Sequence, residues 1–333
     1  MPESPDLSVI VVNWNSADFV RKCLASVYQQ KSRLSIEAIV IDNGSRDGCG
    51  EMIATEFPDA SFIQSEANLG FGRANNLAFE KSNGRLLLFL NPDTEVSESA
   101  IERMAKVLDR IPAAGVVGGR LLNSDLSVQT SCIQRFPTAW RIFMDSDALR
   151  RLFPGWSLWG TRPLFDQPRE AVAVDAISGA CQMIRRDVFR RAGLYNTAYF
   201  MYVEDIDLCR NVMDLGLRNY YVGDAVVVHH GGQSSRGDGE SGRVAVMMRE
   251  SWTRYFELHR GRRYAIGFRA AVALQATCRL MLIAAAWLMA SNRVRRRRLS
   301  LVKNKWNSIL RWAVGLESWV GDVSAKEPCT HTS

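Results

Sequence analysis

The chain of 333 residues is 47% hydrophobic and 23% charged, so it can bury a sizeable core as one large domain with an appendage or as two domains. This composition argues against a disordered or low-complexity protein. The seven cysteines are scattered and form no CxxC pair, which disfavours a disulfide framework and a zinc site built on cysteine. Glu3 and Asp6 replace the basic region of a signal peptide, and the apolar run Val9–Val12 is too short for one. We therefore expect a cytoplasmic protein.

Positive charge is concentrated near the C-terminus. The net charge is +7, yet 13 of the 42 Lys and Arg residues lie between Leu258 and Leu316, where there is no Asp or Glu. The rest of the chain holds 29 basic against 35 acidic residues and is therefore acidic. A basic tail on an acidic body predicts a polyanionic neighbour, either a membrane or a nucleic acid.

Strands and helices alternate in the first part of the chain. Strands are predicted where apolar or β-branched residues run together, and helices where apolar residues recur every three or four positions. In chain order the predicted elements are a strand at 8–12, a helix at 18–30, a strand at 37–41, a helix at 49–57, a strand at 61–64, a helix at 73–82 and a strand at 86–90. This alternation is typical of an α/β fold with a doubly wound, mostly parallel sheet.

The pattern changes further along the chain. Residues 122–172 are rich in Trp, Pro and Arg, and we interpret them as a loop-and-helix excursion beside the substrate site. Strand and helix patterns return at Val172–Val174 and continue to His230. A helical stripe of apolar residues follows over Val244–Leu258, where plain helix packing is an alternative to a membrane role. We therefore predict a catalytic domain over residues 1–240 and a basic helical extension over residues 241–333.

Three predicted strands end in polar clusters, namely Asn13-Trp14-Asn15, Asp42-Asn43-Gly44-Ser45 and Asn91-Pro92-Asp93. Ligands of doubly wound sheets bind at the carboxyl ends of the strands, so we expect a donor site there. A carboxylate just past a buried strand, such as Asp93, suits Mg²⁺ or Mn²⁺ bound together with a diphosphate. The alternative is that Asp93 only caps the following turn or helix.

A second acidic cluster follows at Glu204, Asp205 and Asp207, among apolar residues. Clustered carboxylates in apolar surroundings have perturbed pKa values, which suits a general base. Acidic residues are also favoured at any helix N-terminus, and Asp207 with Arg210 can form an ordinary helical ion pair.

Two weaker signals complete the set. His229 and His230 end a predicted strand before a glycine-rich turn, where a histidine is a metal ligand or merely a hydrogen-bonded residue of the partial core. Gly70, Gly72 and Arg73 precede a helix and suit an anion. The segment is neither a P-loop nor a dinucleotide fingerprint, because it lacks Gly-Lys-Ser/Thr and GxGxxG.

The order of these motifs resembles glycosyltransferase family 2 enzymes with the type A fold, particularly the bacterial rhamnosyltransferase-like branch. The resemblance covers roughly residues 7–260. The matching stretches are residues 11–15, 41–48, 68–76, 89–93, 178–180, 202–209 and 229–234.

The resemblance implies a role for each matching residue. Asp42 would bind the nucleobase, and Asp205 would be the base with Glu204 beside it, giving inversion by a single displacement. Asp93 and His229 would hold Mg²⁺ or Mn²⁺, although His230 is an alternative to His229. The donor-binding set would be Asn13, Asn15, Asp42, Asn68, Gly70, Arg73, Asn76, Asn91 and Asp93.

The chain departs from the family pattern at two places. Asn91 stands where the Asp-X-Asp motif has its first acid, so metal binding depends more on Asp93 and the donor phosphates. The usual Gly-Gly-Phe-Asp-Glu before the acidic cluster reads Gly193-Leu194-Tyr195-Asn196-Thr197 here, which removes two acids from the approach to the acceptor.

We therefore expect an inverting glycosyltransferase that moves a sugar, with rhamnose from dTDP-rhamnose favoured, to a hydroxyl of a glycan or polyprenyl-linked acceptor in cell-surface polysaccharide synthesis. A UDP- or GDP-sugar donor is an alternative. A nucleotidyltransferase would show a glycine-rich N-terminal loop, but residues 8–20 contain no glycine. A catalytically inactive binding protein of the same fold is disfavoured by the intact Asp93, Glu204, Asp205 and His229.

The basic tail favours an anionic membrane surface over nucleic acid, because no nucleic-acid module accompanies it. Ala270–Ala290 is apolar apart from three residues and stands next to Arg293 and Arg295–Arg298, as in an interfacial helix. Arg279 at its centre disfavours spanning. We expect a peripheral protein on the inner face of the membrane, and the sequence does not define an oligomeric state.

Overall fold

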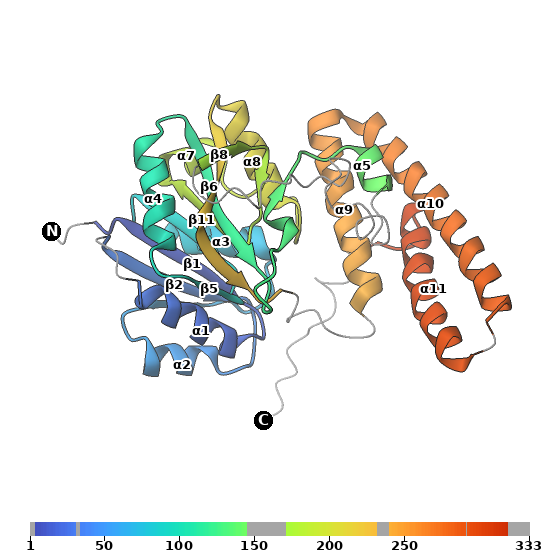
Figure 1. The fold of residues 1–333 in the computed structure, drawn as a ribbon, viewed down its shortest axis with the longest axis horizontal. Coiled ribbons are helices and arrows are strands. Elements are labelled where there is room, and N and C mark those ends of the chain that lie inside the picture. Colours follow the sequence, from blue (N-terminus) through green and yellow to red (C-terminus); the bar gives the residue numbers. More distant parts are fainter. Residues whose placement is uncertain (1–3, 31–33, 145–170, 232–239, 291, 319–333) are drawn as a thin grey trace. The chain divides into compact units, whose positions relative to one another are not determined.

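The structure is a computed structural model that describes residues 4–30, 34–144, 171–231, 240–290 and 292–318 (Figure 1). The chain divides into two compact units, residues 1–234 and residues 235–333. Two parts of the sequence prediction lie outside the described residues. They are residues 145–170 of the excursion and Gly232, Gln233 and Ser234 of the turn after His230.

A nine-stranded mixed sheet forms the first unit, in the order β3-β2-β1-β4-β10-β6-β11-β5, with β8 also paired to β11. Its strands are β1 (Leu7–Asn13), β2 (Ile36–Asp42), β3 (Ser61–Gln64), β4 (Leu86–Leu90), β5 (Thr94–Val96), β6 (Ala114–Leu122), β8 (Ala171–Val174), β10 (Cys181–Arg185) and β11 (Arg218–His229). A separate two-stranded sheet pairs β7 (Ile133–Gln134) with β9 (Ala176–Ile177). The four strands predicted in the first ninety residues are confirmed.

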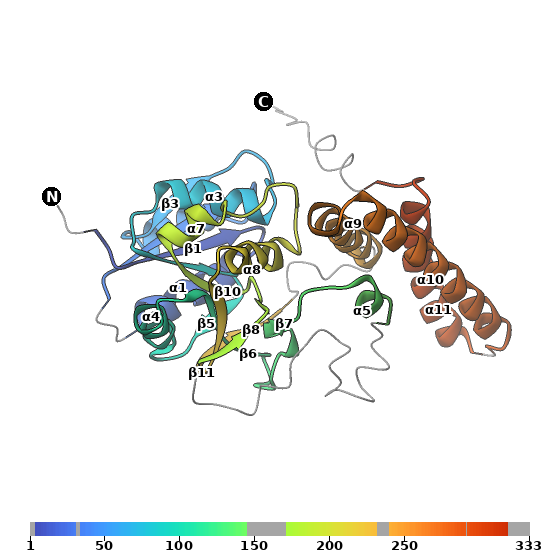
Figure 2. The ribbon, with the colours of Figure 1, turned by 90° about the horizontal axis from the view of Figure 1, so that it is seen from above.

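Helices cover both faces of the large sheet (Figure 2). They are α1 (Ala17–Tyr28), α2 (Cys49–Glu56), α3 (Phe71–Lys81), α4 (Ala100–Arg110), α7 (Arg186–Arg191) and α8 (Glu204–Asp214). The unit also contains a 3₁₀ turn at Thr130–Cys132 and the short helix α5 (Ala139–Met144). Neighbouring residues of β10 show the two faces, because Cys181 contacts Met104 of α4 whereas Gln182 contacts Cys209 of α8. The predicted doubly wound α/β fold is confirmed.

Strand β4 is central because all five of its residues are apolar and buried, as expected of a strand covered on both faces. Strands β1, β2, β3 and β4 are parallel, but β10 runs antiparallel between β4 and β6. The alternation of strands and helices did not predict that direction. As a result, the N-terminal end of β10 meets the C-terminal ends of β4 and β6 at one edge of the sheet.

Three helices form the described part of the second unit, which confirms the predicted helical extension. They are α9 (Glu240–Arg260), α10 (Arg262–Leu288) and α11 (Arg293–Ala313). Phe256 of α9 packs on Phe268 of α10, and Ile309 and Trp312 of α11 are buried. Among the described residues one helix, α10, is long and apolar enough to cross a membrane by length and composition.

Candidate active site

The predicted site residues lie at the edge of the sheet where four strands end. Asn13 ends β1, Asp42 ends β2 and His229 ends β11, while Asp93 follows β4. The antiparallel strand β10 begins at the same edge, where the Asn91 N–H donates to the carbonyl of Ala180 at 3.1 Å. The sheet therefore brings together side chains that are up to about two hundred residues apart in sequence.

Asn13 is fully buried and organises the first part of the site. Its Nδ2 donates to Asp42 Oδ2 at 3.0 Å and to Asp47 Oδ2 at 3.1 Å, and its Oδ1 accepts the Ser16 N–H at 3.1 Å. Asp42 is 2% exposed, and its Oδ1 accepts the Ser45 N–H at 2.6 Å. Asn15 is exposed, with a φ of 51°. Asn13 thus positions Asp42 and the turn that follows it.

Asp47 is a residue that the sequence analysis missed. Its Oδ2 also accepts the backbone N–H of Ala17 at 2.9 Å, so it satisfies a free donor at the start of α1. Its partners Ala17 and Asn13 are 30 and 34 residues away in the sequence. The only signal in the sequence was therefore that Asp47 lies in a turn-forming segment.

The loop before α3 is held by two asparagines. Asn43 Nδ2 donates to Asn68 Oδ1 at 2.9 Å, and Asn68 Oδ1 also accepts the Gly70 N–H at 2.9 Å. Gly70 has a φ of 80°, and the next residue, Phe71, donates its N–H to the Phe200 carbonyl at 2.9 Å. This loop is therefore fastened to the segment that leads to the acidic cluster.

Two predicted residues of α3 differ in their surroundings. Arg73 is exposed in the first turn of the helix. Asn76 bonds the backbone of Tyr195 twice, through its Nδ2 to the carbonyl at 2.8 Å and its Oδ1 to the N–H at 3.1 Å. These bonds connect α3 to the segment Gly193–Thr197, which departs from the family pattern.

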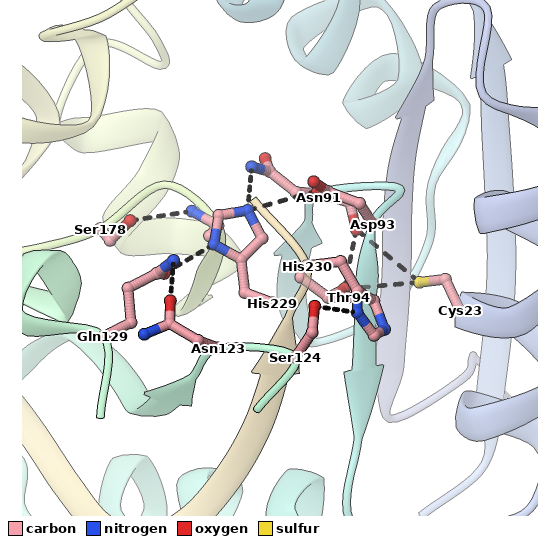
Figure 3. Close-up of polar contacts among 11 residues, drawn as sticks. Cys23, Asn91, Asp93, Thr94, Asn123, Ser124, Gln129, Ser178, His229 and His230 are labelled. Carbon is pink, nitrogen blue, oxygen red and sulfur yellow. Dashed lines mark hydrogen bonds and ion pairs between the residues drawn. The ribbon is translucent and has the colours of Figure 1, made fainter. Parts of the chain in front are cut away.

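His229, rather than His230, faces Asp93 (Figure 3). His229 Nε2 lies 3.3 Å from Asp93 Oδ1 and 3.3 Å from Asn91 Nδ2. His230 points elsewhere, with Nε2 2.8 Å from Glu95 Oε1 and Nδ1 2.8 Å from Ser124 Oγ. Successive side chains of a strand point to opposite sides, which separates the two rings.

Gln129 fixes the orientation of the His229 ring and was also missed by the sequence analysis. Its Oε1 lies 2.7 Å from His229 Nδ1, and its Nε2 donates to Asn123 Oδ1 at 3.2 Å. With the glutamine oxygen as acceptor, Nδ1 carries the proton and Nε2 presents its lone pair towards Asp93. Gln129 stands in the aperiodic stretch 122–172, so no sequence pattern singled it out.

The side chains of Asp93 and His229 suit a divalent ion that is shared with a substrate. Among the described residues, no three His, Cys, Asp or Glu side chains form a cage of their own. Mg²⁺ and Mn²⁺ sites commonly use one or two protein ligands plus substrate phosphates. The 3.3 Å between Asp93 Oδ1 and His229 Nε2 is close to the ~3 Å between neighbouring ligands of an ion with bonds of about 2.1 Å. The residues therefore fit such an ion.

The acidic cluster lies at the start of α8. Asp205 is half-buried, and its Oδ2 accepts the Gly179 N–H at 2.7 Å while Oδ1 accepts the Ile206 N–H at 2.8 Å. Burial raises the pKa of Asp205, and these two bonds oppose the rise. Asp207 is buried and accepts the Tyr199 hydroxyl at 3.0 Å, which makes it an anchor for the preceding segment.

Glu204 is 5% exposed, and its Oε2 has no hydrogen-bond partner among the described residues. Burial, followed by the charge of Asp205, raises the pKa of Glu204 to about 8. Burial therefore favours the proton of this carboxyl pair on Glu204, and Asp205 is the less buried carboxyl of the two.

The backbone that leads into α8 is strained. Tyr202 and Val203 have φ values of 70° and 75°. A positive φ is a genuine outlier for a β-branched residue such as Val203, and residues in such conformations cluster at functional sites. The strain sets the direction from which Glu204 and Asp205 enter the site.

The chain belongs to glycosyltransferase family 2, since the model of Glycosyl transferase family 2 matches residues 8–193, more than half of its length. One curated relative is the N-acetylglucosaminyl-diphospho-decaprenol L-rhamnosyltransferase of Mycobacterium tuberculosis, 28% identical over 317 residues, which cover 90% of this chain and 98% of the relative. The rhamnosyltransferase WbbL of Escherichia coli K12 is 24% identical over 240 residues, covering 68% and 84%. The predicted resemblance to rhamnosyltransferases of this family is confirmed. The family assignment argues against the alternative that the protein is a nucleotidyltransferase.

Solved structures show the same fold. The mannosyltransferase PcManGT from Pyrobaculum calidifontis, in complex with GDP-Man and Mn²⁺, has a TM-score of 0.55 at 18% identity over 95% of this chain and 89% of that chain. GalNAc-T7 with UDP, GalNAc and Mn²⁺ has a TM-score of 0.52 at 17% identity, over 69% of this chain and 44% of that chain. The predicted type A glycosyltransferase fold is confirmed.

Gly70→Ala should damage the site far more than Gly193→Ala. Both residues have positive φ values, 80° and 88°, so alanine carries backbone strain at either position. A Cβ at Gly70 would lie 2.2 Å from the Phe200 carbonyl oxygen, whereas one at Gly193 has nothing within 4 Å. We expect a larger loss of unfolding free energy and of turnover for Gly70→Ala, measured by urea unfolding and an activity assay. Equal losses in both variants would contradict the contact.

Glu204→Gln should remove a pH dependence of stability. Between the ordinary pKa of 4.5 and the raised pKa of about 8, the folded chain holds a proton that the unfolded chain releases. The free energy of unfolding therefore falls as pH rises through this window, by roughly 1.4 kcal/mol per pH unit at most. Gln cannot ionise, so the variant should gain stability over the wild type towards pH 8 in denaturant unfolding. The exposed Glu80→Gln is the control, and an unchanged slope in Glu204→Gln would show that Glu204 is already ionised.

Proposed function

We propose that the protein transfers rhamnose from dTDP-rhamnose, with inversion, to a hydroxyl of a lipid-linked glycan in cell-surface polysaccharide synthesis. The observation that carries this proposal is the convergence of Asp93 with His229 and of Asp205 at one edge of the sheet. The donor and acceptor classes are supported by the two relatives, whose names specify rhamnosyl transfer and, in one case, a diphospho-decaprenol acceptor. The enzyme would work peripherally on the inner face of the membrane, where such acceptors are presented.

The nucleotide end of the donor is assigned to Asp42, which Asn13 and the Ser45 N–H hold in place. Asn15, Asn68 and Gly70 bond the turn after Asp42, since the Asn15 N–H donates to Ser45 Oγ and Asn43 Nδ2 donates to Asn68 Oδ1 and the Gly70 carbonyl. Arg73, exposed at the start of α3, supplies a positive charge for the diphosphate. Asn76 acts indirectly, through its two bonds to Tyr195.

Asp93 and His229 would hold Mg²⁺ or Mn²⁺, which would offset the negative charge of the departing nucleoside diphosphate. Gln129 holds the His229 ring through Nδ1, so that Nε2 is aimed at Asp93. Asn91 donates from Nδ2 towards the same Nε2, which steadies the ring.

Asp205 is the base that accepts the proton of the acceptor hydroxyl. It is half-buried and held by the Gly179 N–H, whereas Glu204 is buried and its pKa is raised to about 8, so the proton of the pair is favoured on Glu204. Two neighbouring carboxyls with different environments thus take different roles. Attack from the Asp205 side opposite the leaving diphosphate gives inversion at the anomeric carbon.

Asp205→Asn should lower the transfer rate by about 10²–10⁴-fold, because an amide cannot accept the proton. Donor affinity should remain, as Asp205 touches none of the residues assigned to the nucleotide. Initial rates of nucleoside diphosphate release and donor binding by calorimetry would separate the two effects. Full loss in Glu204→Gln with an active Asp205→Asn would reverse the assignment of the base.

Mn²⁺-dependent donor binding should require Asp93 and be weakened by Gln129→Ala. Thermal shifts with Mn²⁺ and dTDP-rhamnose, a UDP-sugar or a GDP-sugar measure this directly, since a ligand that binds the folded state raises the unfolding temperature. We expect the largest shift with dTDP-rhamnose, none in Asp93→Ala, and Mn²⁺ affinity about 10–100-fold lower in Gln129→Ala. Asn83→Ala, at the opposite edge of the sheet, is the control. A larger thermal shift with another sugar nucleotide would show that dTDP-rhamnose is not the donor. No turnover with any donor would indicate an inactive binding protein.

A further inference from the structure

The turn between α10 and α11 exposes an unusual amount of apolar surface. We define the hairpin tip as residues 277–290 and 292–305. Only Ala290 is buried within it, and Leu288 and Met289 are 76% and 75% exposed. The other strongly exposed apolar residues of the tip are Met281, Leu282, Trp287, Val294, Leu301 and Val302.

The other end of the hairpin packs partly against α9, although Ile266, Leu274 and Val314 are also exposed there. Phe268 and Ala276 of α10 are buried, as are Ile309 and Trp312 of α11, and the Phe268 ring meets that of Phe256 of α9 edge to face. Buried apolar side chains are therefore concentrated at that end of the hairpin, whereas Ala290 alone is buried among the described residues of the tip. Contiguous exposed apolar surface marks an interaction site in soluble proteins.

The same tip is strongly basic. It contains Arg279, Arg293, Arg295–Arg298, Lys303 and Lys305, and no acidic residue. Two of the arginines lie over tryptophan rings of the opposite helix, with Arg296 4.9 Å from the Trp287 ring centre and Arg279 5.8 Å from that of Trp306. These contacts hold α10 and α11 side by side as far as the turn, as both views of the ribbon show (Figures 1 and 2).

The pairing of α10 with α11 limits how the tip can bind to a bilayer. By itself α10 has the length of a membrane span, with 27 residues and a mean hydropathy of 1.6 in its most apolar window. However, α11 lies along it, so a spanning α10 would carry Arg295–Arg298 and Lys303 into the hydrocarbon. Burying several charges there is costly, and none of them has an acidic partner in the tip.

An interfacial position satisfies both features of the tip. Apolar side chains of interfacial helices enter the boundary between headgroups and acyl chains, while Lys and Arg remain among the phosphates. A nucleic acid would match the positive charge but would leave Leu288 and Met289 in water. Charge complementarity and apolar area together select an anionic lipid surface.

We propose that the hairpin tip docks the protein on a bilayer leaflet rich in anionic lipids, with Leu288, Met289 and Trp287 in the acyl boundary and Arg293 and Arg295–Arg298 on lipid phosphates. This inference rests on the proposed function in one respect, because docking would serve to bring the enzyme to a lipid-linked acceptor. The docking itself requires none of the residues assigned to catalysis.

Co-sedimentation of the full chain with vesicles tests the proposal. Vesicles of phosphatidylcholine alone are compared with vesicles that contain phosphatidylglycerol as well. We expect strong partition only to the anionic vesicles, and partial release by high salt, because salt screens the charges but not the apolar burial.

Two matched double variants separate the tip from basic charge in general. Arg297→Gln with Arg298→Gln removes two adjacent exposed arginines of the tip and should weaken partition about ten-fold. Arg262→Gln with Arg263→Gln removes two adjacent exposed arginines at the other end of α10 and should change it less than about two-fold. Leu288→Ser with Met289→Ser should abolish the salt-resistant part. All substitutions are at exposed positions, and unchanged unfolding midpoints would verify their folding.

Several outcomes would overturn the docking proposal. They are equal partition to both vesicle types, equal losses in the two arginine variants, or binding of a single-stranded RNA without binding of vesicles. A second assay, which measures nucleoside diphosphate release with a soluble acceptor analogue, distinguishes failure of the docking proposal from failure of the proposed function. Turnover without vesicle binding would refute only the docking, and vesicle binding without turnover on any donor would refute only the proposed function.

Discussion

The antiparallel strand β10 physically links the two halves of the candidate site. It pairs with β4, which leads to Asn91 and Asp93, and the turn that precedes it donates the Gly179 N–H to Asp205 at 2.7 Å. A parallel strand in this position would begin at the opposite edge of the sheet. The distance between Asp93 and Asp205 is therefore set by the register of the sheet and by one backbone hydrogen bond.

Electrostatics then distinguishes groups that are chemically alike. Glu204 and Asp205 are neighbours, yet only Asp205 is both accessible and supported by two backbone N–H groups, while Glu204 Oε2 is buried without a partner among the described residues. His229 and His230 are also neighbours, and the opposite directions of their side chains give one of them to Asp93 and the other to Glu95. In both pairs the surroundings, not the residue type, decide the role.

The sequence predicted the parts of the fold that depend on local pattern. The run Leu86–Leu90 and the other N-terminal strands are apolar enough to be recognised, and the order of motifs identified the family. The direction of β10 was not predictable, because strand direction depends on long-range pairing rather than on periodicity. Asp47 and Gln129 were missed for the same reason, since each acts on a residue at least 30 positions away. Asn13 and Asn76 illustrate a related limit, because their positions in the motifs indicated donor contact while their amides bond other parts of the protein.

The anomeric configuration of the transferred sugar tests the account most directly. It can be determined by NMR spectroscopy of the glycoside formed from a donor of known configuration. A hydroxyl activated by Asp205 and displacing the nucleoside diphosphate in one step predicts that the product is inverted. A product with retained configuration would contradict the account, because retention requires two displacements and a nucleophile on the other face of the sugar.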